Sequence, residues 1–251
     1  MKRVFLIFVI VVIGFSSCKK KKPEGPVTPA AEQVVEVHLV PTLDGQVYAL
    51  NEVIESSLGY RYFFTDIKLL GTDMVNGPST LASAFLYNYQ VTGTILATAV
   101  GNKSSFTNLS MNLGVADPLN HADPSLPANA SPLNISNAGD MHWGWNPGYI
   151  FVKLEGKVDT IPDGIDNFDH NFVFHLGMDP VFRTTNFTDL NWTVVSDTKS
   201  KTNLLLQMRT LFDQPGNEID LRVNYTSHSA TSQMPLTNLV MDQFKTAIVK
   251  E

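Results

Sequence analysis

Hydrophobic and polar residues alternate in short runs from Val34 onward, as they do in half-buried β-strands. The first run covers 34–40 and is followed by the turn sequence Leu-Asp-Gly-Gln. An aromatic-rich run at 60–71 alternates imperfectly, as a core strand would. Further runs predict strands at 92–101, 104–115, 148–158, 171–177, 191–197 and 218–225.

Two segments have helical rather than alternating spacing. The segment 49–59 is short and moderately amphipathic, whereas 234–251 repeats apolar residues at the spacing of a longer helix. Ser232 is a plausible N-cap of that second helix, and Pro235 suits its first turn. Many short strands, little helix and no internal repeat predict an all-β fold, mainly an antiparallel β-sandwich with short helices, one of them C-terminal.

The polar, Pro-rich segment 116–139 interrupts the strand pattern. A connection of this length inside a compact domain is usually functional. It leads directly into Gly-Asp-Met-His-Trp-Gly-Trp, where His142, Trp143 and Trp145 fall within four residues of a chain that has only three tryptophans. The segment and the stretch after it are therefore the first candidates for a functional site.

The N-terminus reads as a lipoprotein signal peptide. Lys2 and Arg3 precede an apolar run that is too short to span a bilayer, and small residues lead to Cys18, the only cysteine. We expect Cys18 to become the lipidated first residue, although an unprocessed anchor with an incidental cysteine is the alternative. The expected organisation is a signal peptide at 1–17, a Lys- and Pro-rich tether at 18–32 and a β-domain at 33–251.

The net charge of the folded part limits the classes of partner that we expect. Of the 18 Lys and Arg and the 24 Asp and Glu, six cations and two anions precede residue 33, so the folded part has a formal charge near −10. That charge argues against nucleic acid as a partner and suits a cation or a basic protein. The lysines after Cys18 can lie against anionic head groups or simply be solvated. Because lysines rather than acidic residues follow Cys18, we expect the periplasmic face of the outer membrane.

Four of the six histidines are candidate metal ligands, since neutral imidazole is the usual protein ligand for copper or zinc. None of them forms a close-spaced pair, so each could instead be a histidine bonded into the sheet. His175 would point away from the phenylalanines of its strand, at a strand end that suits a site residue. The candidates are His121, His142, His175 and, in reserve, His38.

Other chemistry has weaker support. Met141 could be a soft ligand but is more typical of a core residue. The acidic run 163–170 lacks the EF-hand pattern and reads better as a surface turn than as a calcium site. Nucleophile elbows, phosphate loops and dinucleotide fingerprints are missing from the sequence, so we expect no enzyme activity.

Several elements together resemble the MbnP-like family, named for a periplasmic protein of methanobactin operons. They are "NLGVADPLNHADPSLP", "SPLN", "DMHWGWNPGYIFVKLEG" and "FVFHLG", in the family's order. The resemblance covers 34–251 and is dense between Asn112 and Gly177. His121 matches the Asn-His element, Trp143 and Trp145 match the Trp-x-Trp pair, and His175 matches His-Leu-Gly. The position of His142 varies in the family.

The resemblance implies an extracytoplasmic β-sandwich that binds copper. It also implies a partner, a diheme enzyme of the cytochrome c peroxidase type, which oxidises a tryptophan to kynurenine, here Trp143 or Trp145. The protein would be a monomer without heme of its own. From the residues alone, the two tryptophans could instead fill one face of a strand. The rival function is an envelope module that binds a carbohydrate or a peptide through exposed tryptophans.

Overall fold

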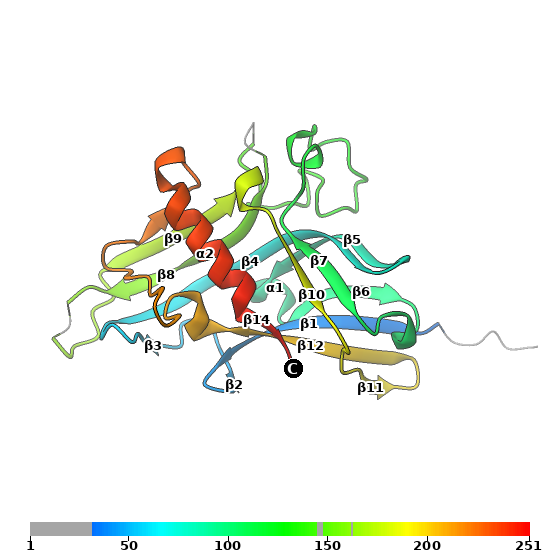
Figure 1. Cartoon of the computed structure of the whole chain (residues 1–251), viewed down its shortest axis with the longest axis horizontal. Coiled ribbons are helices and arrows are strands. Elements are labelled where there is room, and N and C mark those ends of the chain that lie inside the picture. The colour runs from blue at the N-terminus through cyan, green and yellow to red at the C-terminus, as the bar shows by residue number, and fades with distance from the viewer. Residues whose placement is uncertain (1–31, 145–147, 162) are drawn as a thin grey trace, which may run out of the picture. The chain divides into compact units, whose positions relative to one another are not determined.

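Two β-sheets stack around a shared hydrophobic core (Figure 1). The computed structural model describes residues 32–144, 148–161 and 163–251; Cys18, the expected signal peptide, most of the tether and Trp145 lie outside them. Residues Glu32–Glu251 form one compact unit. None of the helices in these described ranges is long and apolar enough to cross a bilayer.

The six-stranded sheet, as described, has β1 and β12 at its centre, and these two strands run parallel. Its strands are β1 (Val34–Leu43), β2 (Gln46–Val47), β6 (Ile95–Val100), β11 (Thr193–Ser196), β12 (Lys199–Gln207) and β14 (Ile248–Lys250). Alternate residues of β1 point into the core, which leaves His38 on the outer face. The expected turn after the first strand is confirmed and connects β1 to β2.

The eight-stranded sheet carries most of the candidate site. Its path is β10 (Arg183–Phe187), β7 (Leu109–Leu113), β4 (Arg61–Asn76), β8 (Ile150–Asp159), β9 (His170–Gly177) and β13 (Thr226–Ser227). Within the described residues, β3 (Ile54–Glu55) and β5 (Ser79–Asn88) also pair with β4. Most pairings are antiparallel, so the expected mainly antiparallel sandwich is confirmed, with the parallel pairs β1–β12 and β9–β13 as exceptions.

A β-bulge explains why the run 60–71 alternates imperfectly. The register of β4 against β8 shifts between Phe64 and Asp66. Before the bulge Phe64 is buried, and after it Ile67 is buried, so the inward parity changes. As a result Asp66 and Lys68 both lie on the outer face of the sheet, next to Glu155 and Lys153 of the paired strand β8.

The C-terminal helix is confirmed as α2 (Met234–Ala247), which packs on β9, β10 and β12 and so bridges the two sheets. Pro235 lies in its first turn as expected, but the predicted cap is wrong: Gln233 precedes the helix and Ser232 belongs to the short helix η5 (Thr231–Gln233). The other helices in the described ranges are one turn long: α1 (Tyr89–Thr92), η1 (Lys103–Ser105), η2 (Leu119–His121), η3 (Asp179–Val181) and η4 (Met208–Leu211).

Two predicted elements are wrong, because contacts with distant parts of the chain override the local sequence preference. The expected helix at 49–59 is instead made of turns on either side of β3, which pairs with β4, because isolated short helices are marginal and strand pairing satisfies the backbone better. The expected strand at 218–225 is a series of turns. Its Leu221 amide donates to the hydroxyl of Tyr60, and its Ile219 amide to the carbonyl of Phe212, so no ladder forms.

Candidate metal-binding site

The candidate site lies at the C-terminal end of β9. His175, Gly177 and Asp179 succeed one another there, and each contacts a segment from elsewhere in the chain. The segments they meet are β8, the long connection 116–144 and the turn after β13. Because His175 and Gly177 are two residues apart on one strand, they lie on the same face of the sheet, which is the outer face.

His175 points outward, as expected, while Phe174 and Leu176 face the core. Its Nε2 lies 2.7 Å from the Oε1 of Glu155 on β8. Its ring also meets the ring of His228 edge-to-face, with centroids 4.8 Å apart. Burial lowers the pKa of His175, and the hydrogen bond to Glu155 opposes that shift only in part. The imidazole is therefore neutral at neutral pH, the form that binds metals.

His228 is held opposite His175 by its neighbours. Ser227 pairs with Phe174 through β13. The Ser229 hydroxyl donates to the carbonyl of His175 and accepts from the amide of Gly177, at 3.1 Å and 3.0 Å. The exposed His228 ring thus stands on a backbone that is fastened to β9 on both sides.

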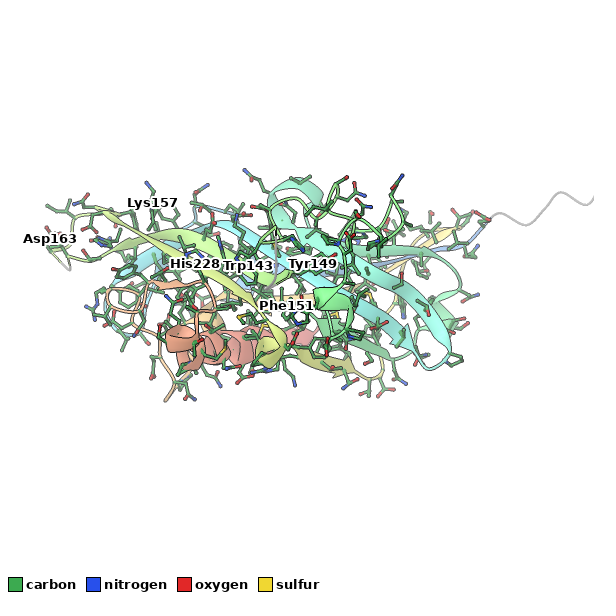
Figure 2. All side chains as sticks on the ribbon, turned by 90° about the horizontal axis from the view of Figure 1, so that it is seen from above. Trp143, Tyr149, Phe151, Lys157, Asp163 and His228 are labelled. Carbon is green, nitrogen blue, oxygen red and sulfur yellow. The ribbon has the colours of Figure 1, made fainter. Side chains whose placement is uncertain are left out.

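Trp143 occupies the space above Gly177. A Cβ built on Gly177 would lie 2.5 Å from the Cη2 of Trp143 and 2.5 Å from the carbonyl oxygen of Tyr149. The indole ring therefore rests directly on the bare backbone of β9, and it is half-buried. Trp143 and His228 both lie over this end of the strand (Figure 2).

His121 reaches the same strand end through Asp179. Its Nε2 lies 2.8 Å from Oδ2 of Asp179. The neighbouring Asn120 is fully buried, donates to Oδ1 of Asp179 and accepts the amide hydrogen of Tyr149, both at 3.0 Å. Residues 116–139 form no strand, as expected for a long connection, and Asn120 fixes its position on the sheet.

His142 lies with His121 along one cleft. The cleft has a volume of about 500 Å³ and is lined by Asn120, His121, Ala122, Asp123, Pro124, His142, Gly144 and Gly148. The Nδ1 of His142 accepts the amide hydrogen of Gly144 at 2.8 Å, and its ring meets Tyr149 edge-to-face. Burial lowers the pKa of His142, so this imidazole is also neutral.

Charged side chains continue the site across the outer face of β8 and β4. Lys153 contacts Glu155 at 3.1 Å and also pairs with Asp140, which Lys68 binds at 2.8 Å. Burial alone would raise the pKa of Asp140, but the hydrogen bonds from the two lysines outweigh it and lower that pKa to about 2. The same balance, with hydrogen bonds from His175 and Lys153, lowers the pKa of Glu155. One oxygen of Asp66, Oδ1, is buried with no partner in the described residues.

The structure does not bring His38 to this site. His38 is on the six-stranded sheet, where Nδ1 contacts the hydroxyl of Thr94 at 2.8 Å and Nε2 contacts Glu36 at 3.3 Å. Met141 is buried in the core, as predicted by the interpretation of it as a core residue rather than a ligand. The carboxylates of 163–170 bind Arg61 or accept hydrogen bonds from nearby backbone amides, which agrees with a surface turn.

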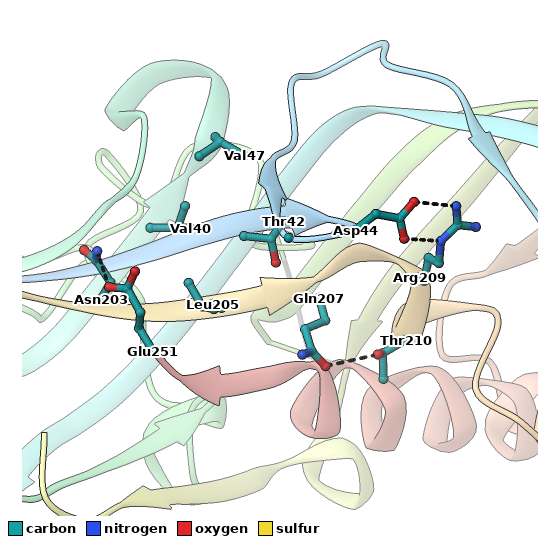
Figure 3. Close-up of a pocket in the computed structure, with 11 residues that line it drawn as sticks. Val40, Thr42, Asp44, Val47, Asn203, Leu205, Gln207, Arg209, Thr210 and Glu251 are labelled. Atoms are coloured by element: carbon teal, nitrogen blue, oxygen red, sulfur yellow. Dashed lines mark hydrogen bonds and ion pairs between the residues drawn. The ribbon is translucent and has the colours of Figure 1, made fainter. Parts of the chain in front are cut away.

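Across the described residues, no three His, Cys, Asp or Glu side chains form a ready-made metal cluster. The site therefore offers a pair of imidazoles, His175 and His228, with His142 and His121 on the adjoining cleft. Sequence reasoning missed His228, because it lies about fifty residues after His175 and no spacing links the two. A second groove, of about 450 Å³, lies on the six-stranded sheet, between Glu251 and the Asp44–Arg209 ion pair, and is lined by no histidine (Figure 3).

Comparison with known proteins identifies the fold family. The family model named MbnP matches residues 32–234. The chain belongs to the MbnP family. This is a family of secreted periplasmic proteins. Among solved structures, the chain is similar to MbnP from Methylosinus trichosporium, with 15% identity, a TM-score of 0.49 and coverage of 79% of this chain and 82% of that one. No curated protein matches the chain in sequence.

Proposed function

We propose that this member of the MbnP family binds copper at the C-terminal end of β9 and is not itself an enzyme. In the proposed mature form, Cys18 carries a lipid that holds the protein at the periplasmic face of the outer membrane. His175 is the central donor, with His228 beside it and with His142 and His121 on the adjoining cleft. His38 is no longer a candidate, because Thr94 and Glu36 engage its two ring nitrogens.

The single observation that carries the proposal is the His175–His228 contact beside a carboxylate. Two imidazoles with ring centroids 4.8 Å apart supply nitrogen donors to one region, and Glu155 supports one of them. Nitrogen- and oxygen-rich donor sets suit Cu(II), and ligating histidines usually donate their second N–H to a carboxylate. Because at least one further donor is needed, copper binding involves a shift of His142 or His121, or a donor from outside the described residues.

The proposal includes modification of Trp143 or Trp145 to kynurenine by a diheme partner enzyme, as the resemblance to the family implies. Trp143 supports this because its indole lies over the strand that carries His175. Kynurenine would add an aryl amine and a carbonyl next to the imidazoles. Trp143 does not support the rival carbohydrate- or peptide-binding function, since its ring rests on β9 rather than standing free as a platform.

Copper titration of the mature protein tests the proposal. We expect one tightly bound copper in the wild type. His175→Ala should weaken binding by more than about 100-fold, since outer-shell partners alone are worth about 10–100-fold. The matched control is His170→Ala, which removes an exposed histidine of the same strand, one whose ring meets Tyr225 edge-to-face. Equal affinity in all three proteins would refute the proposal.

Mass spectrometry of protein from the native host tests the modification separately. We expect a peptide spanning Trp143 and Trp145 to carry the mass of one kynurenine. Unmodified tryptophans, together with the absence of bound copper, would favour the rival function.

A further inference from the structure

We propose that Glu155, held in place by Lys153, is a positioning residue that fixes His175 in the tautomer with hydrogen on Nε2. The nitrogen that can bind a metal is then Nδ1. The tautomer is a property of the metal-free protein, and only its consequence for copper rests on the proposed function.

The hydrogen-bond geometry decides the tautomer. Nε2 of His175 lies 2.7 Å from Oε1 of Glu155, and a carboxylate oxygen there can only accept. A neutral imidazole that donates from Nε2 keeps its lone pair on Nδ1. No side chain or backbone group of the described residues hydrogen-bonds to Nδ1, so none of these groups competes with a metal for that lone pair.

Lys153 prevents the carboxylate from turning away. Its Nζ lies 3.1 Å from the same Oε1 atom that His175 contacts. Lys153 is opposite His175 in the β8–β9 register and is only 8% exposed, so the ammonium has little freedom to leave. Glu155 therefore receives two donors on one oxygen, and each of them restrains the other.

The same lysine also restrains the connection that carries His142 and Trp143. Lys153 pairs with Asp140, two residues before His142, and Lys68 binds Asp140 from the other side at 2.8 Å. A short chain of contacts thus joins the imidazole of His175 to the backbone that positions Trp143. The ammonium of Lys153 serves both, which explains why a lysine is nearly buried on the outer face of a sheet.

Long-range ¹H–¹⁵N spectra of the imidazoles in the metal-free mature protein test the tautomer. We expect the wild type to show His175 protonated on Nε2 and unprotonated on Nδ1. Glu155→Gln should keep that tautomer, because the amide oxygen can still accept, whereas Glu155→Ala should give a mixture of the two. The His170 signals serve as a fold control that these substitutions leave unchanged. A wild type with hydrogen on Nδ1 would overturn the inference, as would a Glu155→Ala protein with an unaltered tautomer.

Copper affinity adds a second readout. Glu155→Ala should lose about 10–100-fold, and Glu155→Gln clearly less, since the conservative variant preserves the orientation of the ring. A wild type that binds no copper would refute the proposed function and leave the tautomer result to decide the inference. A Glu155→Ala protein with mixed tautomers but full copper affinity would overturn the claim that Nδ1 is the donor selected by Glu155.

Discussion

The two sheets each carry a histidine, a glutamate and a lysine in contact on the outer face, and the two sets differ in what completes them. On the eight-stranded sheet, His175 contacts Glu155 at 2.7 Å, and Lys153 binds the same carboxylate at 3.1 Å. The lysine side chain is 10% exposed, so this set is largely withdrawn from water.

On the six-stranded sheet, His38 contacts Glu36 at 3.3 Å, and Lys199 binds the other oxygen of Glu36 at 2.6 Å. Here the lysine side chain is 41% exposed. The second ring nitrogen of His38 contacts the hydroxyl of Thr94, so the ring is fully engaged by its own surroundings.

The difference shows why a histidine–glutamate pair alone does not mark a metal site. Thr94 closes the set on the six-stranded sheet, whereas a second imidazole, His228, lies beside His175. A structural histidine has both nitrogens satisfied, and a donor keeps one lone pair directed to where other donors can gather. Thr94 and His228, rather than the two glutamates, therefore make the two histidines different.

The largest expected effect on stability comes from the lysines. Lys153→Met should lower the free energy of unfolding by about 2–4 kcal/mol, because it removes a nearly buried cation from its contacts with Glu155 and Asp140. Lys199→Met should cost under about 1 kcal/mol, as exposed ion pairs do. Urea denaturation of both variants measures the difference. Equal losses would show that the two sets are energetically alike.

The next largest effect on stability comes from the packing of Trp143 on Gly177. Gly177→Ala should cost about 1–3 kcal/mol, because its Cβ would meet the indole ring and a carbonyl oxygen at 2.5 Å. Gly101→Ala, in the bend directly after β6 of the six-stranded sheet, is the control, because the new Cβ would meet Phe106 at 3.4 Å. Denaturation and the fluorescence of Trp143 should both change in the first variant, and an unperturbed Gly177→Ala protein would contradict the placement of the indole.

The smallest effect concerns Thr94. Thr94→Val removes the hydroxyl partner of His38 and should cost about 0.5–1.5 kcal/mol, the net worth of one hydrogen bond. Copper affinity should remain that of the wild type, because no second imidazole approaches His38 in the described structure. Calorimetric melting and copper titration check both parts, and a new copper site in this variant would mean that an open nitrogen suffices.

The alternating pattern predicted most of the sandwich because inward-facing residues repeat at a period of two wherever one face is buried. It failed where tertiary contacts override local preference. The segment 49–59 pairs with β4, and 218–225 bonds to Tyr60 and Phe212. The strands β5, β10 and β12 escaped detection, since their many Ser, Thr and Asn residues blur the alternation.

The candidate site could be predicted only where its residues belong to motifs. His121, Trp143 and His175 stand in such motifs, and the structure places all three at the end of β9. His228 could not be found this way, because its position depends on the Ser229 contacts and the parallel β9–β13 pairing. The same holds for Glu155, which becomes informative only once β8 and β9 are in register.

Electron paramagnetic resonance of the protein loaded with one equivalent of Cu(II) tests the central claim most directly. We expect nitrogen hyperfine couplings from imidazole that are identical in the wild type and in His38→Ala, and that lose one nitrogen in His228→Ala and in His175→Ala. A spectrum that changes in His38→Ala, or that is unaffected by removal of both His175 and His228, would contradict the assignment of copper to the end of β9.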